Sequence, residues 1–392
     1  MLYAQALTPA ARRPRGRHNS LNTMPAKVLH VLPIEAPRGA QRYAKALRDT
    51  LDGPSLAHRT LTIFESATRV LDADIKLDVR RTPFSHFGFE PLAALSLRKA
   101  LASERPDVIV AHGSQPLKYL VPLVARDLPL IYYKIGVVSA KARSGPGRWL
   151  HVATLRRPQR IAGVSQECLD EAERLFGVPR TKLVLITNGR DPAQFQARVP
   201  DSAESGPPRL IFVGHFAPTK RPAWFLDIVT QLRRDGVVFS ATMVGDGPLF
   251  AQLQGAARAA HVELLGHRDD IARLLREHDV FAFTSEPSGE GMPGVFIEAG
   301  LSALPIVSTD VAGARTVIAE GISGYVVPPD DSNAFVQRLR TLLTQPELRL
   351  AMGQAARARC LERFTLKEST DRWRRLLDEQ LALAAGARGG LQ

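Results

Sequence analysis

Short apolar, β-branched runs alternate with amphipathic stretches along the first half of the chain. Six such runs are KVLHVLPI, RTLTIF, DVIVAHG, LPLIYYKIG, RIAGVS and LVLITNG, and segments such as GAQRYAKALRDTL and PLAALSLRKALASE separate them. Continuous apolar runs are typical of strands buried on both faces, and alternation with helices is typical of a parallel sheet. The pattern therefore predicts a doubly wound α/β domain.

The alternation breaks once and then starts again. The break is QARVPDSAESGPP, residues 196–208, which is polar, contains three prolines and has no period. After it come RLIFVGH, FSATMVGDG, VELLG, DVFAFTS, LPIVST and GYVVPPD. Because 392 residues are too many for one ordinary core, we expect two Rossmann-like domains joined by a linker.

The expected boundaries follow from this pattern. We place a disordered basic tail at residues 1–24, an N-terminal domain at 25–195, the linker at 196–208 and a C-terminal domain at 209–365. A last helix, 366–392, could cross back to the N-terminal domain. Open parallel sheets bind ligands beyond the carboxyl ends of their strands, so two facing domains should form a central ligand cleft.

The segment SGEGMPGVFIEAGLSALPIVSTD, residues 288–310, carries the strongest chemical signal. Pro293 is suited to open a helix, which leaves the amides of Gly294 and the next two residues free to bind an anion. Glu298 would then face a ribose diol, and Glu290 would face whatever is attached to the phosphates. The pattern indicates a nucleotide-sugar site, although Glu290 could instead cap the helix and Glu298 could be a solvated helical residue.

Three further strands each end in glycine, where a ligand must pass close to the backbone. IFVGHFAPTKRP ends a strand at Gly214 and offers Lys220, which can neutralise a diphosphate. MVGDGP places Gly245 at a second strand end, and LLGH places Gly266 at a third. Each signal is weak alone, but their order and spacing favour a phosphate-binding edge.

Net charge divides the chain in two. The whole chain carries +13, but residues 1–200 contain 31 Lys and Arg against 16 Asp and Glu, whereas residues 201–392 carry −2. The basic half suggests an anionic partner such as lipid headgroups or a phosphorylated substrate, or simply a solubilising surface. No apolar run reaches the roughly 20 residues of a membrane span, and the first residues do not form a secretory signal.

Several other classes of function are disfavoured. Cys168 and Cys360 fit no metal-ligand spacing and suggest a reduced, intracellular location. The DAD motif at Asp72–Asp74 lacks the context of a metal site and is better read as a turn. Basic residues are not interleaved with aromatic platforms, so nucleic acid is not an expected partner.

Taken together, these motifs resemble the retaining GT-B glycosyltransferases of the family-four group, also called glycosyl transferases group 1. The resemblance runs from about Lys27 to the late C-terminal helix. Glu290 and Glu298 match the E-x7-E signature, and VGDGP is matched in full. The other matching positions are Val164, Ser165, Gly177, Val178, Pro179, Asn188, Gly189, Asp191, Val213, Gly214, Lys220, Gly313, Gly324, Pro328, Pro329 and Asp330.

The resemblance implies a metal-independent hexosyltransferase that uses a UDP- or GDP-sugar, no cofactor, and a lipid-linked or saccharide acceptor. Catalytic roles fall to Glu290 and Lys220. The implied donor-binding residues are Gly214, His215, Lys220, Arg221, Gly245, Gly266, Glu290, Gly291, Met292, Pro293, Gly294 and Glu298. The acceptor would meet the basic half, at Arg38, Gly39, His112 and Lys134. Such a protein would be cytoplasmic and could lie at the inner face of the plasma membrane.

Two departures from the family pattern bear on activity. His215 stands where many relatives have Arg, and Arg221 could compensate for the lost charge. Lys134-Ile135-Gly136 stands where the family has its sugar-contacting His, and we expect Ile135 to face the donor. The alternatives are therefore a relative that binds nucleotide sugar without transfer, or a GT-B sugar-nucleotide epimerase.

Two N-terminal features keep two interpretations each. His112 either contacts the acceptor or is a strand-end histidine bonded locally. The basic, glycine-rich segment from Ser139 to Trp149 is either a mobile loop at a membrane or phosphorylated acceptor, or a solvated loop.

Overall fold

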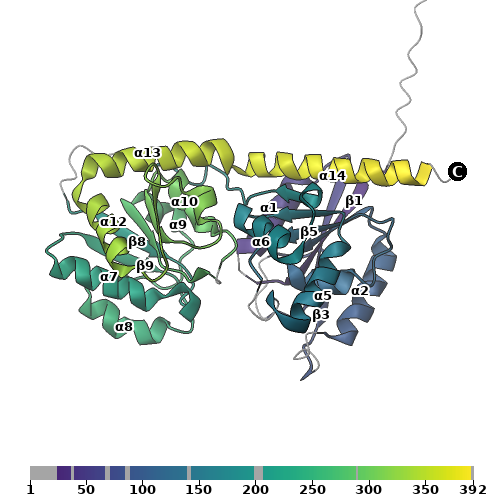
Figure 1. Ribbon diagram of the computed structural model, residues 1–392, viewed down its shortest axis with the longest axis horizontal. Helices are drawn as coiled ribbons and strands as arrows, with labels where there is room; N and C mark the ends of the chain where they lie inside the picture. The colour runs from purple at the N-terminus through teal and green to yellow at the C-terminus, as the bar shows by residue number, and fades with distance from the viewer. Residues whose placement is uncertain are drawn as a thin grey trace, which may run out of the picture.

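A computed structural model describes residues 24–36, 39–66, 71–83, 89–138, 143–197, 206–287 and 290–389, with side chains to residue 386. The chain forms two α/β domains side by side (Figure 1). The expected tail, most of the linker and Arg38 lie outside the described residues.

The N-terminal domain is built on a parallel sheet in the order β3-β2-β1-β4-β5-β6-β7. Its strands are β1 (Ala26–Ile34), β2 (Leu56–Phe64), β3 (Ile75–Val79), β4 (Val108–His112), β5 (Leu130–Lys134), β6 (Arg160–Gly163) and β7 (Leu183–Leu185). Its helices are α1 (Gly39–Leu51), α2 (Pro91–Glu104), α3 (Ser114–Leu120), α5 (Gly145–Arg156) and α6 (Gln166–Phe176). The six predicted strands are confirmed. The edge strand β3 was not predicted, because its sequence IKLDV is not one of the continuous apolar runs by which the other strands were identified.

The C-terminal domain is built on a second parallel sheet in the order β10-β9-β8-β11-β12-β13. Its strands are β8 (Arg209–Val213), β9 (Ser240–Val244), β10 (Glu263–Leu264), β11 (Val280–Phe283), β12 (Ile306–Thr309) and β13 (Gly324–Val327). Its helices are α7 (Pro222–Arg234), α8 (Phe250–Ala259), α9 (Ile271–Arg276), α10 (Gly294–Leu301), α11 (Ala314–Val317), α12 (Ser332–Thr344) and α13 (Pro346–Arg363). All six predicted strands are present, which confirms two Rossmann-like domains.

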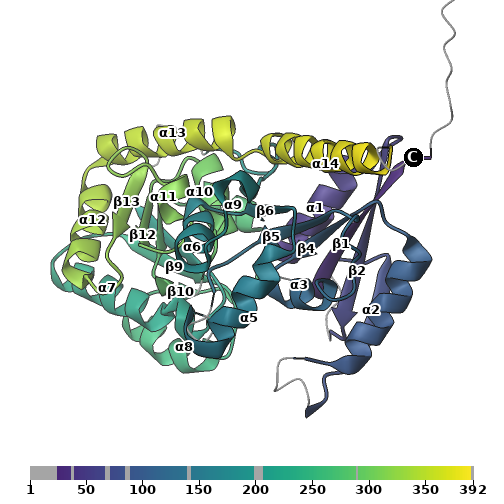
Figure 2. The same ribbon diagram turned by 45° about the vertical axis from the view of Figure 1, so that its right-hand side comes forward.

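The last helix, α14 (Leu366–Gly389), follows α13 after a short break and lies along the N-terminal domain (Figures 1 and 2). Trp373 is fully buried there, and its indole N–H donates to the hydroxyl of Tyr43 on α1 at 3.0 Å. The Ser369 hydroxyl bonds Tyr43 and also donates to the Thr187 carbonyl at 2.7 Å. The helix expected over 366–392 is therefore part of the N-terminal core.

Polar and apolar contacts connect the two domains. One apolar cluster contains Tyr43, Phe296 and Trp373, so it runs from the N-terminal sheet through α14 to the C-terminal domain. Glu167, in the first turn of α6, accepts from the Gly313 amide at 3.1 Å and the Thr316 hydroxyl at 3.2 Å. These contacts hold the facing ends of the two sheets close together.

Candidate active site

A cavity of about 850 Å³ lies between the two domains, within the size range of small-ligand sites. The N-terminal domain contributes Gly39 and Arg42 from α1, and the segment Ile135–Val137 after β5. The C-terminal domain contributes the segments that follow β8, β9 and β11, and the start of α10. The cavity thus lies where the carboxyl ends of both parallel sheets meet, as expected for this fold.

The ends of β8 and β9 form a wall on which glycine is required. Gly245 has φ +143°, and a Cβ atom there would lie 1.9 Å from the Gly214 carbonyl oxygen. The Gly245 amide donates to the Gly266 carbonyl at 2.8 Å. Gly214, Gly245 and His215 line the cavity, whereas Gly266 does not; its neighbours His267 and Arg268 do. Gly266 therefore supports the wall through Gly245, which corrects its expected direct role.

Glu290 and Lys220 form an ion pair at the cavity, with 11% and 18% of their side chains exposed. The Lys220 ammonium lies 5.4 Å from the centre of the Phe283 ring, and the Lys220 carbonyl accepts from the Thr284 hydroxyl at 3.0 Å. Burial lowers the pKa of Lys220 to about 8. The two residues with expected catalytic roles are thus in direct contact.

The start of α10 faces the same cavity. Pro293 is the N-cap residue rather than the first helical residue, and Gly291, Met292, Pro293 and Gly294 all line the cavity. The amide of Phe296 donates to the Pro293 carbonyl at 3.2 Å, so it is not available to an anion as expected. The amides of Gly294 and Val295 make no hydrogen bond to residues that the structure describes.

Gly291 is the point of closest approach between the donor-side loop and the N-terminal domain. A Cβ atom on Gly291 would lie 2.1 Å from the Ile135 carbonyl oxygen and 2.6 Å from the Gly136 Cα atom. Met292 also contacts the N-terminal domain, because its carbonyl accepts from the side-chain amide of Asn188 at 3.4 Å. The loop that contributes Glu290 is therefore packed directly against the segment after β5.

Glu298 lines the cavity from α10 and is paired with Arg190, which sequence reasoning missed. The Arg190 Nε atom donates to Glu298 Oε1 at 2.6 Å. Arg190 also lines the cavity, although it lies 108 residues earlier in the chain. The available signal was its place directly after Asn188-Gly189, at the end of the N-terminal domain.

Two expected site residues lie elsewhere. Arg221 does not line the cavity: its guanidinium donates to the Pro329 carbonyl at 2.5 Å, pairs with Asp330 and stacks on Trp224. Lys134 is fully buried, pairs with Glu171 at 2.6 Å and donates to the Gly136 carbonyl at 2.8 Å. Strand alternation directs Lys134 into the domain, whereas Ile135 lines the cavity, in agreement with the expected orientation.

His112 belongs to a row of three buried histidines. Its Nε2 atom lies 3.0 Å from His30 Nδ1, and His30 Nε2 lies 2.9 Å from His58 Nδ1. Burial lowers the pKa of all three rings, to about 3 for His112 and about 4 for His58. His112 borders a smaller cavity of about 200 Å³ that shares Ile135 and Gly136 with the main one. It therefore lies beside the site, bonded locally, rather than in its wall.

The segment from Ser139 to Trp149 is not a loop throughout. Residues 139–142 lie outside the described residues, and α5 begins at Gly145. Trp149 and Leu150 are 79% and 71% exposed in its first turns. Among the described residues, no group of His, Cys, Asp and Glu could hold a metal ion. None of the described helices combines the length and apolar character needed to cross a membrane.

Comparisons with known proteins agree with this geometry. Residues 37–194 match the family Glycosyltransferase Family 4, and residues 207–345 match the family Glycosyl transferases group 1. Amylovoran biosynthesis glycosyltransferase AmsK of Erwinia amylovora is 25% identical over 281 residues, which cover 69% of this chain and 61% of AmsK. The match therefore spans less than two thirds of that relative.

For a second relative and for a solved structure, the match spans a larger share of the other protein. The UDP-Gal:alpha-D-GlcNAc-diphosphoundecaprenol alpha-1,3-galactosyltransferase of Escherichia coli is 24% identical over 300 residues, 71% of this chain and 76% of that protein. The structure of Anabaena HepE in complex with UDP-glucose has a TM-score of 0.74 at 19% identity, covering 90% of this chain and 99% of HepE. This last likeness concerns the fold.

The family matches fall on the two domains that the structure separates. The first covers the N-terminal domain from α1 to β7, which leaves β1 outside the match, and the second covers the C-terminal sheet with the Glu290–Glu298 segment. Each of the two domains thus matches a glycosyltransferase family, Glycosyltransferase Family 4 in the first and Glycosyl transferases group 1 in the second, and the chain has the fold of the GT-B glycosyltransferases.

Proposed function

We propose that this protein is a retaining, metal-independent hexosyltransferase. It would move a sugar from a UDP- or GDP-sugar to a lipid-linked or saccharide acceptor. The observation that carries the proposal is the pairing of Glu290 with Lys220 and of Glu298 with Arg190 around one interdomain cavity. Paired charges of both signs suit a ligand that presents hydroxyls at both ends and phosphates between them.

The C-terminal residues divide the donor between them. The amides of Gly294 and Val295, at the positive end of α10, are placed to bind a phosphate, and Lys220 adds a cation. Glu298 would accept from the ribose hydroxyls, and Glu290 from the sugar hydroxyls. Gly214 and Gly245 let the diphosphate approach the backbone closely. HepE, which shares this fold, has been crystallised in complex with UDP and with UDP-glucose, which supports a uridine donor.

In the proposed reaction, the acceptor hydroxyl attacks the anomeric carbon on the face from which the diphosphate leaves. The bond from that carbon to the phosphate oxygen breaks, and the departing oxygen takes the hydroxyl proton. No protein nucleophile and no cofactor are required. The protein contributes positioning, and Lys220 and the α10 amides stabilise the charge that develops on the leaving group.

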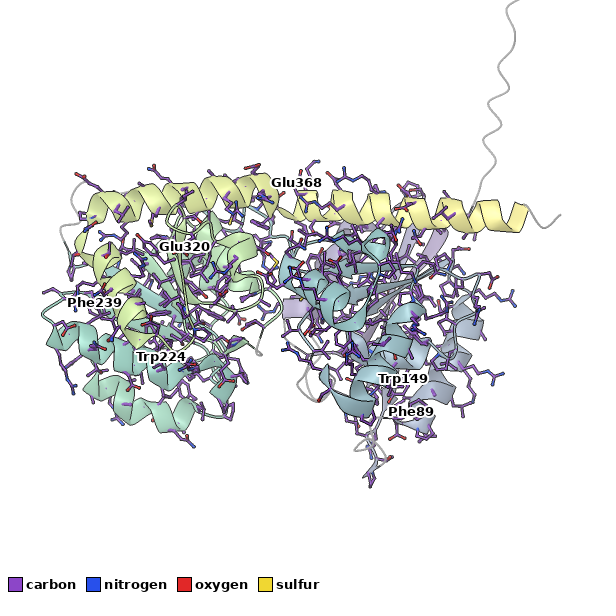
Figure 3. The ribbon with its side chains drawn as sticks, in the orientation of Figure 1. Phe89, Trp149, Trp224, Phe239, Glu320 and Glu368 are labelled. Atoms are coloured by element: carbon purple, nitrogen blue, oxygen red, sulfur yellow. The ribbon has the colours of Figure 1, made fainter. Side chains whose placement is uncertain are left out.

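The N-terminal half is the proposed acceptor side, at a membrane surface. Trp149 and Leu150 are exposed on α5, and Figure 3 shows Trp149 and Phe89 on the part of this domain away from α14. Residues 1–200 carry the excess of positive charge. Exposed aromatic and basic groups together favour an anionic interface. The E. coli relative is named for a diphosphoundecaprenol acceptor, which makes a polyprenyl diphosphate the first acceptor to test.

The donor is tested by thermal shift against UDP-, GDP- and ADP-sugars, followed by detection of released nucleoside diphosphate and of sugar transfer. A ligand at 100 times its dissociation constant should stabilise the protein by about 2.7 kcal/mol. Glu298→Ala should lose on the order of 1.5–3 kcal/mol of nucleotide binding for each charged hydrogen bond removed. Failure of every nucleoside diphosphate to bind would refute the proposal.

A non-transferring nucleotide-sugar binder is the second candidate, because Ile135 lines the cavity where the family has a sugar-contacting His. It would bind the donor without release of nucleoside diphosphate in the presence of acceptor. An epimerase would instead interconvert free nucleotide sugars without any acceptor.

The membrane surface is tested by liposome flotation. Binding should rise with anionic lipid and fall with salt. Leu150→Ala should weaken it, whereas Ile322→Ala, which trims an apolar residue of similar exposure on the C-terminal domain (64% against 71%), should not. Equal binding to neutral and anionic vesicles would contradict this part of the proposal.

A further inference from the structure

Arg190 is held at the junction of the two domains by its own backbone. Its amide donates to the Phe364 carbonyl at 3.0 Å, and its carbonyl accepts from the Leu366 amide at 2.7 Å. Phe364 and Leu366 flank the break between α13 on the C-terminal domain and α14 on the N-terminal domain. The preceding Gly189 packs so closely on Thr365 that a Cβ atom would lie 2.5 Å from the Thr365 carbonyl oxygen. The backbone of Arg190 is therefore fixed in position relative to both domains.

The guanidinium of Arg190 is only partly used within the protein. Its Nε atom bonds Glu298 Oε1 at 2.6 Å, and its Nη1 atom donates to the Gly189 carbonyl at 3.1 Å. The Nη2 atom makes no hydrogen bond with the residues that the structure describes. It lies against Gly294, where a Cβ atom would be 2.0 Å from it. The free N–H groups of Arg190 are thus beside the first residue of α10.

Few cations of the cavity are equally well placed. Arg42 is exposed on α1. Arg268 donates from its Nε and Nη2 atoms to the two carboxylate oxygens of Asp270, at 2.8 and 2.7 Å. Lys220 and Arg190, by contrast, have 18% and 17% of their side chains exposed. Each is paired with one carboxylate of the Glu290–Glu298 segment. A charge that is largely removed from water interacts more strongly with a ligand than an exposed one.

We propose that Arg190 is a phosphate-binding residue of the donor site, in addition to Lys220. Its Nη2 atom donates to a phosphate oxygen of the nucleotide at the start of α10, while its Nε atom keeps the Glu298 carboxylate directed at the ribose. This inference rests on the nucleotide-sugar site proposed above. The planar fork of Arg suits two acceptors on one edge, here one carboxylate oxygen and one phosphate oxygen.

The consequence is a specific dependence on the phosphates of the ligand. A residue that only positions Glu298 would affect uridine and UDP equally, because both carry the ribose. A residue that also binds phosphate would affect UDP much more than uridine. The comparison of these two ligands therefore separates a phosphate contact from a supporting role.

The test measures the affinities of UDP and uridine by calorimetry or ligand-observed NMR for the wild-type chain, Arg190→Gln and Arg190→Lys. Arg190→Gln should weaken UDP about 10- to 100-fold, the loss expected for one charge-assisted hydrogen bond, and uridine by less than about threefold. Arg190→Lys keeps the positive charge but loses the planar fork of the guanidinium, so its UDP affinity should lie between those of the wild-type chain and Arg190→Gln. It also keeps the test available if Arg190→Gln does not fold.

Arg221→Ala is the matched control, because it removes one guanidinium next to Lys220 that does not line the cavity. Its UDP affinity should equal that of the wild type. Equal losses of UDP and uridine in Arg190→Gln, or unchanged UDP affinity, would overturn the inference. A wild-type chain that binds neither UDP nor GDP would instead refute the proposed function, so the two failures are distinguishable.

Discussion

Gly291→Ala should separate the donor loop from the N-terminal domain. The new methyl group would lie 2.1 Å from the Ile135 carbonyl oxygen, and 2.6 Å from both the Ile135 carbonyl carbon and the Gly136 Cα atom. Non-bonded carbon atoms prefer separations of about 3.5–4.0 Å, so the two segments must part by roughly 1 Å. All three contacted atoms belong to backbone, which cannot rotate away as a side chain would. Gly291 has no positive φ, so the clash is the cause of the effect.

Overpacking of this kind costs about 1–3 kcal/mol. For domains of this size each kcal/mol lowers the melting temperature by about 2–4 °C, so we expect a decrease of roughly 2–12 °C. The loop also carries Glu290 and leads into α10, so UDP affinity should decrease as well. Thermal unfolding followed by circular dichroism and UDP titration measure the two effects.

Gly136→Ala provides the control. It adds a methyl group on the other side of the same interface, at a place where no atom would lie within 4 Å of the new Cβ atom. Its melting temperature and UDP affinity should stay near wild type. If Gly291→Ala also behaves like wild type in both measurements, the two domains do not pack here as described, and the reasoning is refuted.

Three further predictions concern residues of the site and its support. Burial lowers the pKa of Lys220 to about 8, so its ammonium is charged below that pH and loses its charge above it. The UDP affinity, measured by calorimetry, should therefore fall as the pH rises from 7 to 9.5. Lys220→Arg should abolish this pH dependence, and a flat profile for the wild-type chain would contradict the prediction. Ile135→His should change donor preference or turnover in a nucleotide-release assay while UDP affinity stays near wild type; unchanged turnover with every donor would show that Ile135 does not contact the sugar. Lys134→Met removes the buried partner of Glu171, which keeps Arg143 at 2.9 Å and the Val138 amide at 3.0 Å, so urea unfolding should show a loss of about 1–3 kcal/mol. Lys134→Met with Glu171→Leu should partly restore the stability, and equal stabilities of all three proteins would argue against a buried ion pair.

Local sequence was sufficient for most of the fold. The apolar runs that became β4, β5 and β11 are buried throughout, and burial on both faces is what produces an uninterrupted apolar run. The edge strand β3 has one buried position of five, so it has no continuous apolar run, and its alternation of apolar and charged residues over five positions was a weaker signal. The start of α10 was predictable because Pro and Gly at the beginning of a helix report directly on backbone geometry.

Side-chain pairing across the chain was beyond the sequence. Arg190 and Glu298 are 108 residues apart, and Lys134 and Glu171 are 37 apart, so neither pair leaves a periodic signal. The contacts of Arg221 were hidden for the same reason: its partners at Pro329 and Asp330 lie more than a hundred residues later. Which charged side chain faces the ligand depends on its partner elsewhere in the chain, and a sequence motif contains only one residue of each such pair.

The contact between Trp373 and Tyr43 joins residues 330 positions apart, and it has a consequence for synthesis on the ribosome. The first domain emerges from the ribosome long before α14. The Tyr43 hydroxyl and the neighbouring apolar surface therefore stay uncovered until the end of translation, when α14 is made. Cores completed by contacts so distant in sequence form slowly, and exposed apolar surface in the interval invites aggregation. The nascent N-terminal domain is therefore the stage of biogenesis at which a chaperone would be needed, and a ribosome stalled before residue 373 would carry a domain with an open core.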